Sequence, residues 1–291
     1  MQHVIERVKT NKMRKIQKPI DDAGQVFRTC ISSVRDENLK SRLEAIETDV
    51  AFAAVGFEAA ASVARLDTIP SQSNVGSVTN NEMTNVYTER MAKKGTPGRP
   101  VYDKLLAAPA YGRCPLCGLR DVSTLDHHLP KDHYPALSVV PINLVPACPS
   151  CNKAKTNAIP RSEDDQTLHP YYDDVENDRW LYAEVIQGSP VALNYFVDPP
   201  RAWDAHLAAR VKHHFNVFKL AALYGAHAAE TLVSIRGHLG QIYDEDGRAC
   251  VKLHLRRQAD SYAAVHTNSW QTAMYYALET STWYCDGGFR Q

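Results

Sequence analysis

Four of the seven cysteines are arranged in two C-x-x-C pairs. Cys114 and Cys117 form the first pair, and Cys148 and Cys151 form the second, with thirty residues between the pairs. A gap of two residues lets both thiolates of a pair face one point, so four such sulfurs can surround a tetrahedral zinc ion. Because four cysteine ligands leave no open coordination position, the predicted zinc is structural. The alternative is a set of four free thiols in a core.

Polar side chains follow one another between and just after these cysteine pairs. Asp126, His127 and His128 occur in one short run, Asn143 lies sixteen residues after His127, and Asn152 follows the last cysteine directly. A carboxylate, imidazoles and two carboxamides are therefore held in or beside one zinc-pinned loop.

In order and spacing, this segment resembles the HNH endonuclease superfamily. The ββα-metal motif of that family reads Asp-His-x-x-Pro on the first strand, Asn-Leu on the second strand, and Asn or His on the helix. The resemblance covers about residues 111–157, roughly a sixth of the 291-residue chain, and includes the version with flanking C-x-x-C pairs. It implies two strands and a helix around a catalytic metal, and a phosphodiester hydrolase acting on DNA.

The resemblance also implies a role for each polar residue. His127 is the general base that takes a proton from the attacking water, as suits an imidazole with a pKa near its ordinary value of about 6.5. Asp126 and Asn152 are the protein ligands of one divalent cation, Mg²⁺ or Mn²⁺. Asn143 orients His127 through a hydrogen bond. Helix spacing, rather than the resemblance, places Lys155 on the same face as Asn152, where it either contacts a phosphate of the cleaved strand or belongs to a solvated helix face.

Two assignments stay open. Either His127 or His128 could be the base, and the family places its base three residues before the proline, which selects His127 before Pro130. His128 is then either a further metal ligand or a structural histidine. The aromatic run from His169 to Asp174 is either a packed turn, which we favour, or a surface on which a tyrosine stacks against a base.

Composition is that of an ordinary globular protein, with 44% hydrophobic and 23% charged residues. Thirty-three basic residues balance thirty-three acidic ones, so contact with nucleic acid must come from a local patch. The sequence has neither an apolar run long enough for a membrane span nor a secretory signal within its first twenty residues. We therefore expect no membrane association and a cytoplasmic location.

The pattern predicts an α+β protein that is mostly helical. We expect an N-terminal helical region over 1–100, the zinc-bound HNH module over 101–180, and a β-hairpin with a C-terminal helical bundle over 181–291. Apolar residues at helical spacing from Asp36 to Phe57 predict one long helix with Asp36 as its N-cap. Other expected elements are the hairpin strands 182–186 and 191–197, and helices over 203–228, 230–243, 251–265 and 270–280.

The sequence thus favours a metal-dependent DNA endonuclease. One alternative is a non-catalytic zinc module that binds nucleic acid or protein. Another is a nuclease subunit that is silent without a partner, by analogy with the HNH effectors that bacteria pair with an ATPase in anti-phage defence. Homing and restriction roles share the same chemistry. The residues do not indicate cleavage specificity, strand preference, a choice between DNA and RNA, or an oligomeric state.

Overall fold

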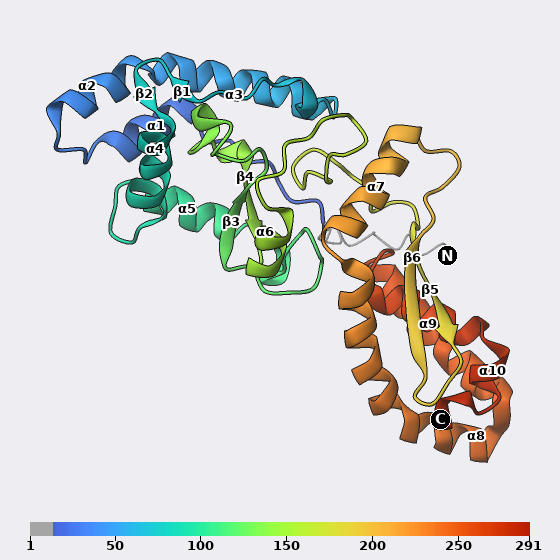
Figure 1. The fold of residues 1–291 in the computed structure, drawn as a ribbon. Helices are drawn as coiled ribbons and strands as arrows, with labels where there is room; N and C mark the ends of the chain where they lie inside the picture. The colour runs from blue at the N-terminus through green and yellow to red at the C-terminus, as the bar shows by residue number, and fades with distance from the viewer. Residues whose placement is uncertain (1–13) are drawn as a thin grey trace, which may run out of the picture. The chain divides into compact units, whose positions relative to one another are not determined.

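The computed structural model of the protein describes residues 14–291 (Figure 1). Residues 1–13, which include most of the segment inspected for a secretory signal, lie outside the described residues. The described chain divides into two units, 14–174 and 175–291. The predicted N-terminal region and most of the predicted HNH module therefore share one unit, and the three-part division stays a prediction.

The first unit begins with a series of helices. They are α1 (Ala23–Ile31), α2 (Glu37–Ala45), α3 (Glu47–Ser62), α4 (Asn80–Asn85), the π-helical turn η2 (Val86–Ala92) and α5 (Arg99–Leu106). A two-residue hairpin, β1 (Asn74–Val75) and β2 (Val78–Thr79), precedes α4. Buried apolar side chains from these helices form one core with those of the zinc-pinned loop.

The predicted long helix is two helices. Asp36 does cap α2, because its carboxylate accepts a hydrogen bond from the Leu39 backbone N–H at 2.9 Å. The helix ends at Ile46, whose backbone turns to φ −100° and ψ 7°. Ile46 is only 3% exposed, and the break lets it pack in the same core as Leu43 and Val50. The apolar period continues across the junction, so it did not reveal the break.

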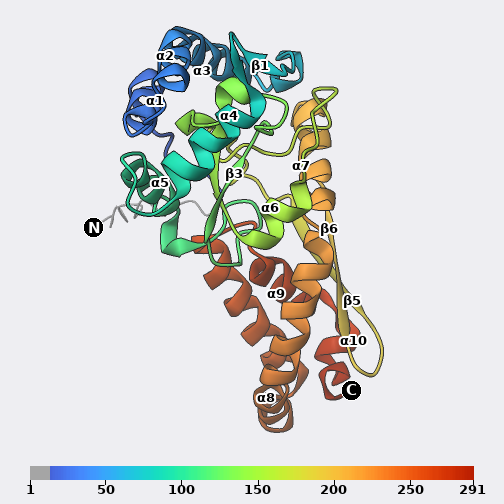
Figure 2. The same cartoon turned by 60° about the vertical axis from the view of Figure 1, so that its left-hand side comes forward.

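The strands that carry the candidate site form an antiparallel pair followed by a helix. β3 (Thr124–His127) pairs with β4 (Leu144–Ala147), with Asp126 opposite Val145 and His127 opposite Leu144. α6 (Pro149–Lys155) begins directly after β4 and packs against β3 (Figure 2). The ββα arrangement expected from the resemblance is therefore present.

The second unit combines a hairpin with long helices. β5 (Leu181–Ile186) and β6 (Ala192–Val197) pair antiparallel, as predicted, and pack against α8 and α9. The helices are α7 (Ala205–Val217), α8 (Leu220–Val265), α9 (Trp270–Thr280) and the short α10 (Thr282–Cys285).

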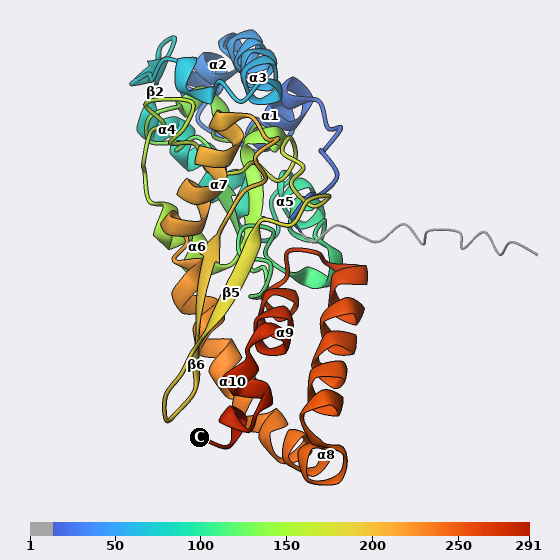
Figure 3. The same cartoon turned by 90° about the vertical axis from the view of Figure 1, so that its right-hand side faces the viewer.

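The predicted helix break at position 229 is wrong, whereas the predicted gap over 244–250 contains a sharp turn of α8. The first helix ends at Val217, and Lys219 adopts a left-handed conformation with φ 50°, so α8 begins well before the predicted start at position 230. α8 then continues past position 243 and changes direction at Gly247, where φ is 74° and ψ is −174°. Only glycine adopts this conformation readily. Figure 3 shows the two halves of α8 running in opposite directions beside α9.

These elements confirm the predicted α+β class: small antiparallel sheets within a largely helical chain. Within residues 14–291, none of the helices combines the length and hydropathy required to cross a membrane.

Candidate active site and metal centre

The two cysteine pairs meet at one point. All four sulfurs lie within 4.8 Å of one another, and all four residues are buried. Cys114 and Cys117 belong to a turn that closes with Gly118 at φ 66°, while Cys148 caps the N-terminus of α6 and Cys151 lies in its first turn. In a tetrahedral site with Zn–S bonds of about 2.3 Å, the sulfurs are about 3.8 Å apart. The cluster therefore fits a zinc ion.

Backbone and thiol hydrogen bonds prepare these sulfurs for a cation. The N–H of Arg120 points to the Cys117 sulfur and that of Cys151 to the Cys148 sulfur, each at 3.4 Å. Hydrogen bonds from neighbouring thiols, Cys114 first among them, lower the pKa of Cys117 to about 6 and also lower the pKa of Cys148. The same thiol contacts raise the pKa of Cys114 and Cys151. Binding of a divalent ion would displace the thiol protons, and the ion would neutralise the resulting thiolates.

Asp126 on β3 is buried beside the end of α6. It is 4% exposed, and its Oδ2 lies 3.2 Å from Nζ of Lys155. Burial raises the pKa of the Asp126 carboxyl, and the charge of Lys155 opposes this rise. The angles of the ion pair do not make a hydrogen bond to Oδ2, and within residues 14–291 no other group donates one. This oxygen therefore has a free lone pair for a cation.

Lys155 lies inside the module. Its side chain is 7% exposed, and Nζ also donates a hydrogen bond of 2.6 Å to the backbone carbonyl of His127. We expected this ammonium on an open helix face, where it would meet a phosphate. The structure instead places it against Asp126, because the helix ends at Lys155 and its last turn faces β3.

His127 lies at the end of β3 with its ring fixed by a backbone group. Its Nε2 is 2.8 Å from the carbonyl oxygen of Ser138, and the ring of Tyr87 packs edge-on at 4.4 Å between centroids. Because a carbonyl oxygen only accepts, Nε2 carries the proton and Nδ1 has the lone pair. Burial lowers the pKa of His127 to about 3, although the Ser138 hydrogen bond raises it. The sequence led us to expect a pKa near the ordinary value, and this expectation is wrong. The ring is neutral at pH 7.

Asn143 braces the loop between the strands. Its Oδ1 accepts a hydrogen bond from the Leu129 N–H at 2.7 Å, and its Nδ2 donates to the carbonyls of Leu129 at 3.0 Å and Leu137 at 3.2 Å. These bonds occupy both amide hydrogens, so the predicted hydrogen bond from Asn143 to His127 is replaced by the one to Ser138. Asn143 positions His127 only through the backbone of this loop.

Asn152 joins α6 to β3. Its Nδ2 donates to Oγ1 of Thr124 at 3.1 Å and to the carbonyl of Leu125, the neighbour of Asp126, at 3.4 Å. Nδ2 of Asn152 is therefore occupied by these two hydrogen bonds. Oδ1 remains, and an amide oxygen suits a hard cation.

His128 packs against the aromatic loop that follows the module. Its ring centroid is 4.1 Å from that of His169, and both residues are buried. Tyr171 is also buried and donates a hydrogen bond of 2.7 Å to the carbonyl of Leu144 on β4. The favoured interpretation of this loop as a packed turn agrees with these contacts. Tyr171 is not exposed to a base, and His128 takes part in the same packing.

Two residues at the site, Ser138 and Tyr87, were missed from the sequence, and one contact of a third was not foreseen. Ser138 contributes a backbone carbonyl, which its residue type does not reveal. Tyr87 lies forty residues before His127 in the chain and reaches it only through the fold. His169 was recognised as part of an aromatic run, but nothing in the spacing indicated its contact with His128.

Comparison with known proteins agrees with this geometry. Residues 114–158 match the HNH endonuclease family. Together with the clustered cysteines, this match confirms the recognition of a cysteine-bound HNH module. The chain is also similar to Protein ea31 of Escherichia phage lambda, with 34% identity over 170 residues that make up 57% of each chain. The present chain thus spans little more than half of that relative. No solved structure gives a significant match.

Proposed function

We propose that this protein is a metal-dependent HNH endonuclease that hydrolyses phosphodiester bonds of DNA. The observation that carries the proposal is the 2.8 Å contact between Nε2 of His127 and the Ser138 carbonyl oxygen, which leaves Nδ1 available, within a segment that matches the HNH family. A fixed imidazole with a free lone pair has the geometry that a general base requires, while the pKa lowered by burial makes this ring a weak base.

In this proposal Nδ1 of His127 takes a proton from water, and the oxygen of that water attacks the phosphorus as the bond to the leaving 3′ oxygen breaks. Asp126 through Oδ2 and Asn152 through Oδ1 would hold one Mg²⁺ or Mn²⁺. Such a cation stabilises the negative charge on the phosphate and on the leaving oxygen.

The donor set fits a hard, partly hydrated ion. Among the residues that the structure describes, the four cysteines are the only cluster of three or more histidine, cysteine or acidic ligands. Asp126 and Asn152 alone would leave several coordination positions to water and phosphate oxygens, as magnesium prefers. His128 stays a candidate ligand, and Lys155 a candidate phosphate contact if it leaves Asp126.

The test is cleavage of plasmid DNA, single-stranded DNA and RNA by zinc-loaded protein with magnesium, manganese or EDTA. We expect metal-dependent cleavage that His127→Ala abolishes. His133→Ala is the matched control, since this half-buried histidine lies in the same loop. Cleavage that survives in His127→Ala would refute the assigned base, and intact nucleic acid in every arm would favour the non-catalytic zinc module.

A role in restriction or anti-phage defence, and pairing with an ATPase subunit, are further proposals that rest on the resemblance alone. Co-purification with an ATPase, and cleavage only in its presence, would support them.

A further inference from the structure

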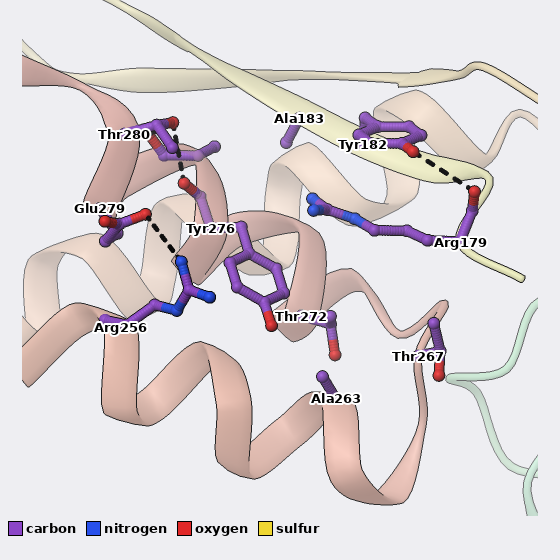
Figure 4. A pocket seen from close by; sticks show the side chains of 11 residues that line it. Arg179, Tyr182, Ala183, Arg256, Ala263, Thr267, Thr272, Tyr276, Glu279 and Thr280 are labelled. Carbon is purple, nitrogen blue, oxygen red and sulfur yellow. Dashed lines mark hydrogen bonds and ion pairs between the residues drawn. The ribbon is translucent and has the colours of Figure 1, made fainter.

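A pocket of about 460 Å³ lies within the unit formed by residues 175–291. Its walls are the residues around the start of β5, the second half of α8, the turn after α8, and α9 (Figure 4). The chemically active lining residues are two arginines, two tyrosines, three threonines and one glutamate: Arg179, Arg256, Tyr182, Tyr276, Thr267, Thr272, Thr280 and Glu279.

Arginines and tyrosines alternate along this pocket. The guanidinium carbon of Arg179 lies 4.4 Å from the ring centroid of Tyr182 and 4.5 Å from that of Tyr276. The guanidinium of Arg256 lies 5.3 Å from the same Tyr276 ring. In Figure 4 both guanidinium groups point toward the Tyr276 ring in the middle of the pocket. Stacking occupies the faces of Arg179, so its N–H groups, which lie in the guanidinium plane, remain for a ligand.

The two arginines differ in their charge partners. Arg256 is paired with Asp260 at 3.1 Å and more loosely with Glu279 at 3.9 Å. Arg179 takes part in no ion pair with any residue from 14 to 291, and its buried Nε has no hydrogen-bond acceptor there. Arg179 is half-buried, so its charge is partly removed from water, and this burial lowers its pKa. A half-buried cation without an acid partner favours an anion.

The backbone that carries Arg179 is held in place. Oδ1 of Asn268 accepts hydrogen bonds from the N–H groups of Trp180 and Leu181 at 2.8 and 3.2 Å. Its Nδ2 donates to the carbonyls of Val175 and Asp178 at 3.3 and 2.8 Å. Asn268 is 3% exposed. The positions on both sides of Arg179 are therefore fixed, so a ligand does not have to order this segment.

We propose that this pocket binds the phosphate group of a nucleotide, with Arg179 as the anchor. A guanidinium offers two parallel N–H donors to phosphate oxygens, and the Thr267 hydroxyl, which makes no hydrogen bond elsewhere in the described chain, supplies another. Glu279 lies on the other side of Tyr276 from Thr267 and Arg179 (Figure 4). Its carboxylate lies 3.6 Å from Nζ of Lys252 and 3.9 Å from Arg256, and its remaining lone pairs would accept a hydrogen bond from a sugar hydroxyl or a base amine.

The size of the pocket limits the ligand to about one nucleotide, since small-molecule sites occupy roughly 300–1,000 Å³. A free mononucleotide and the phosphorylated end of a strand share the required chemistry. The proposal concerns binding in the second unit and does not rest on the nuclease function proposed for the HNH module.

The test is calorimetric titration of the full, zinc-loaded chain with dAMP, deoxyadenosine, glutamate, and a trinucleotide with either a 5′-phosphate or a 5′-hydroxyl. We expect dAMP or the 5′-phosphorylated trinucleotide to bind, and the ligands without phosphate to bind at least tenfold more weakly. Tighter binding of dAMP would identify a free nucleotide as the ligand of the pocket. Tighter binding of the phosphorylated trinucleotide would identify the phosphorylated end of a strand as the ligand.

Arg179→Gln should weaken binding by about tenfold or more, the usual effect of losing a charge-assisted hydrogen bond. Arg257→Gln is the matched control. It removes the same charge from an exposed position on α8 that follows Arg256 in the chain but does not line the pocket. Thr267→Val is a milder change that serves if Arg179→Gln fails to fold, and it should weaken binding severalfold. Absence of binding to any phosphate ligand, equal binding of glutamate, or unchanged affinity in folded Arg179→Gln would overturn the proposal.

Discussion

Replacing Asn143 with alanine tests the hydrogen bonds that hold the loop beside His127. Asn143 is fully buried and makes three hydrogen bonds, of 2.7, 3.0 and 3.2 Å, to the backbone of Leu129 and Leu137. Each bond contributes about 1 kcal/mol, and the orphaned buried N–H and carbonyl groups add a further penalty. We therefore expect Asn143→Ala to lower the free energy of unfolding by about 3–5 kcal/mol, a large part of the usual 5–15 kcal/mol.

The assay is urea unfolding with zinc in excess, followed by circular dichroism. Asn157→Ala is the control, because Asn157 is exposed and makes a single side-chain hydrogen bond, to Asp132 at 2.6 Å. It should cost less than about 1 kcal/mol. All four tryptophans lie in the second unit, so their fluorescence reports on residues 175–291 alone. A loss below about 1 kcal/mol in Asn143→Ala would refute the reasoning, since orphaned buried groups cost at least that much.

Three further predictions follow from other contacts. Cys148→Ser should abolish binding of about one zinc per chain and unfold the first unit, as metal analysis and circular dichroism would show; a folded, zinc-free variant would contradict this. The hydrogen bond from Arg42 lowers the pKa of Glu82 from 4.5 to about 2, so this carboxylate stabilises the fold above pH 4.5 and loses that effect as the pH falls toward 2. Melting temperatures from pH 2 to 6 should show this loss in the wild type and a smaller one in Glu82→Gln. Gly247→Ala should cost about 1–3 kcal/mol in urea unfolding because of its positive φ, whereas Gly237→Ala, in regular helix with open space around it, should stabilise by about 0.5–1 kcal/mol; equal effects would refute the backbone argument.

The parts of the site that the sequence predicted are those encoded by local spacing. The cysteine pairs met as expected because the two-residue gaps of Cys114–Cys117 and Cys148–Cys151 each fit one turn around a metal. The ββα arrangement followed from the order of Asp126, His127 and Asn143 in a known motif.

The errors concern contacts between distant residues and the ends of helices. The partner of His127 is a backbone carbonyl, and Lys155 turns inward because α6 ends there; neither is visible in residue types. The gap between the predicted helices 230–243 and 251–265 contains the turn at Gly247, whereas the helical pattern from 203 to 228 concealed the break at Lys219. The pocket around Arg179 combines segments up to a hundred residues apart and has no sequence signature.

The hydrogen bond between His127 and the Ser138 carbonyl makes the site tolerant of small substitutions at position 138 and sensitive to loop length. Every residue at position 138 supplies a carbonyl, and the Ser138 hydroxyl is buried without a hydrogen-bond partner in residues 14–291, so a residue of similar size, such as alanine, would keep the bond to His127. The orientation of the base is instead determined by the number of residues between β3 and β4. During divergence, insertions and deletions in this loop would be selected against together with changes to Asn143 and the buried apolar side chains, because each would move the carbonyl that orients the base.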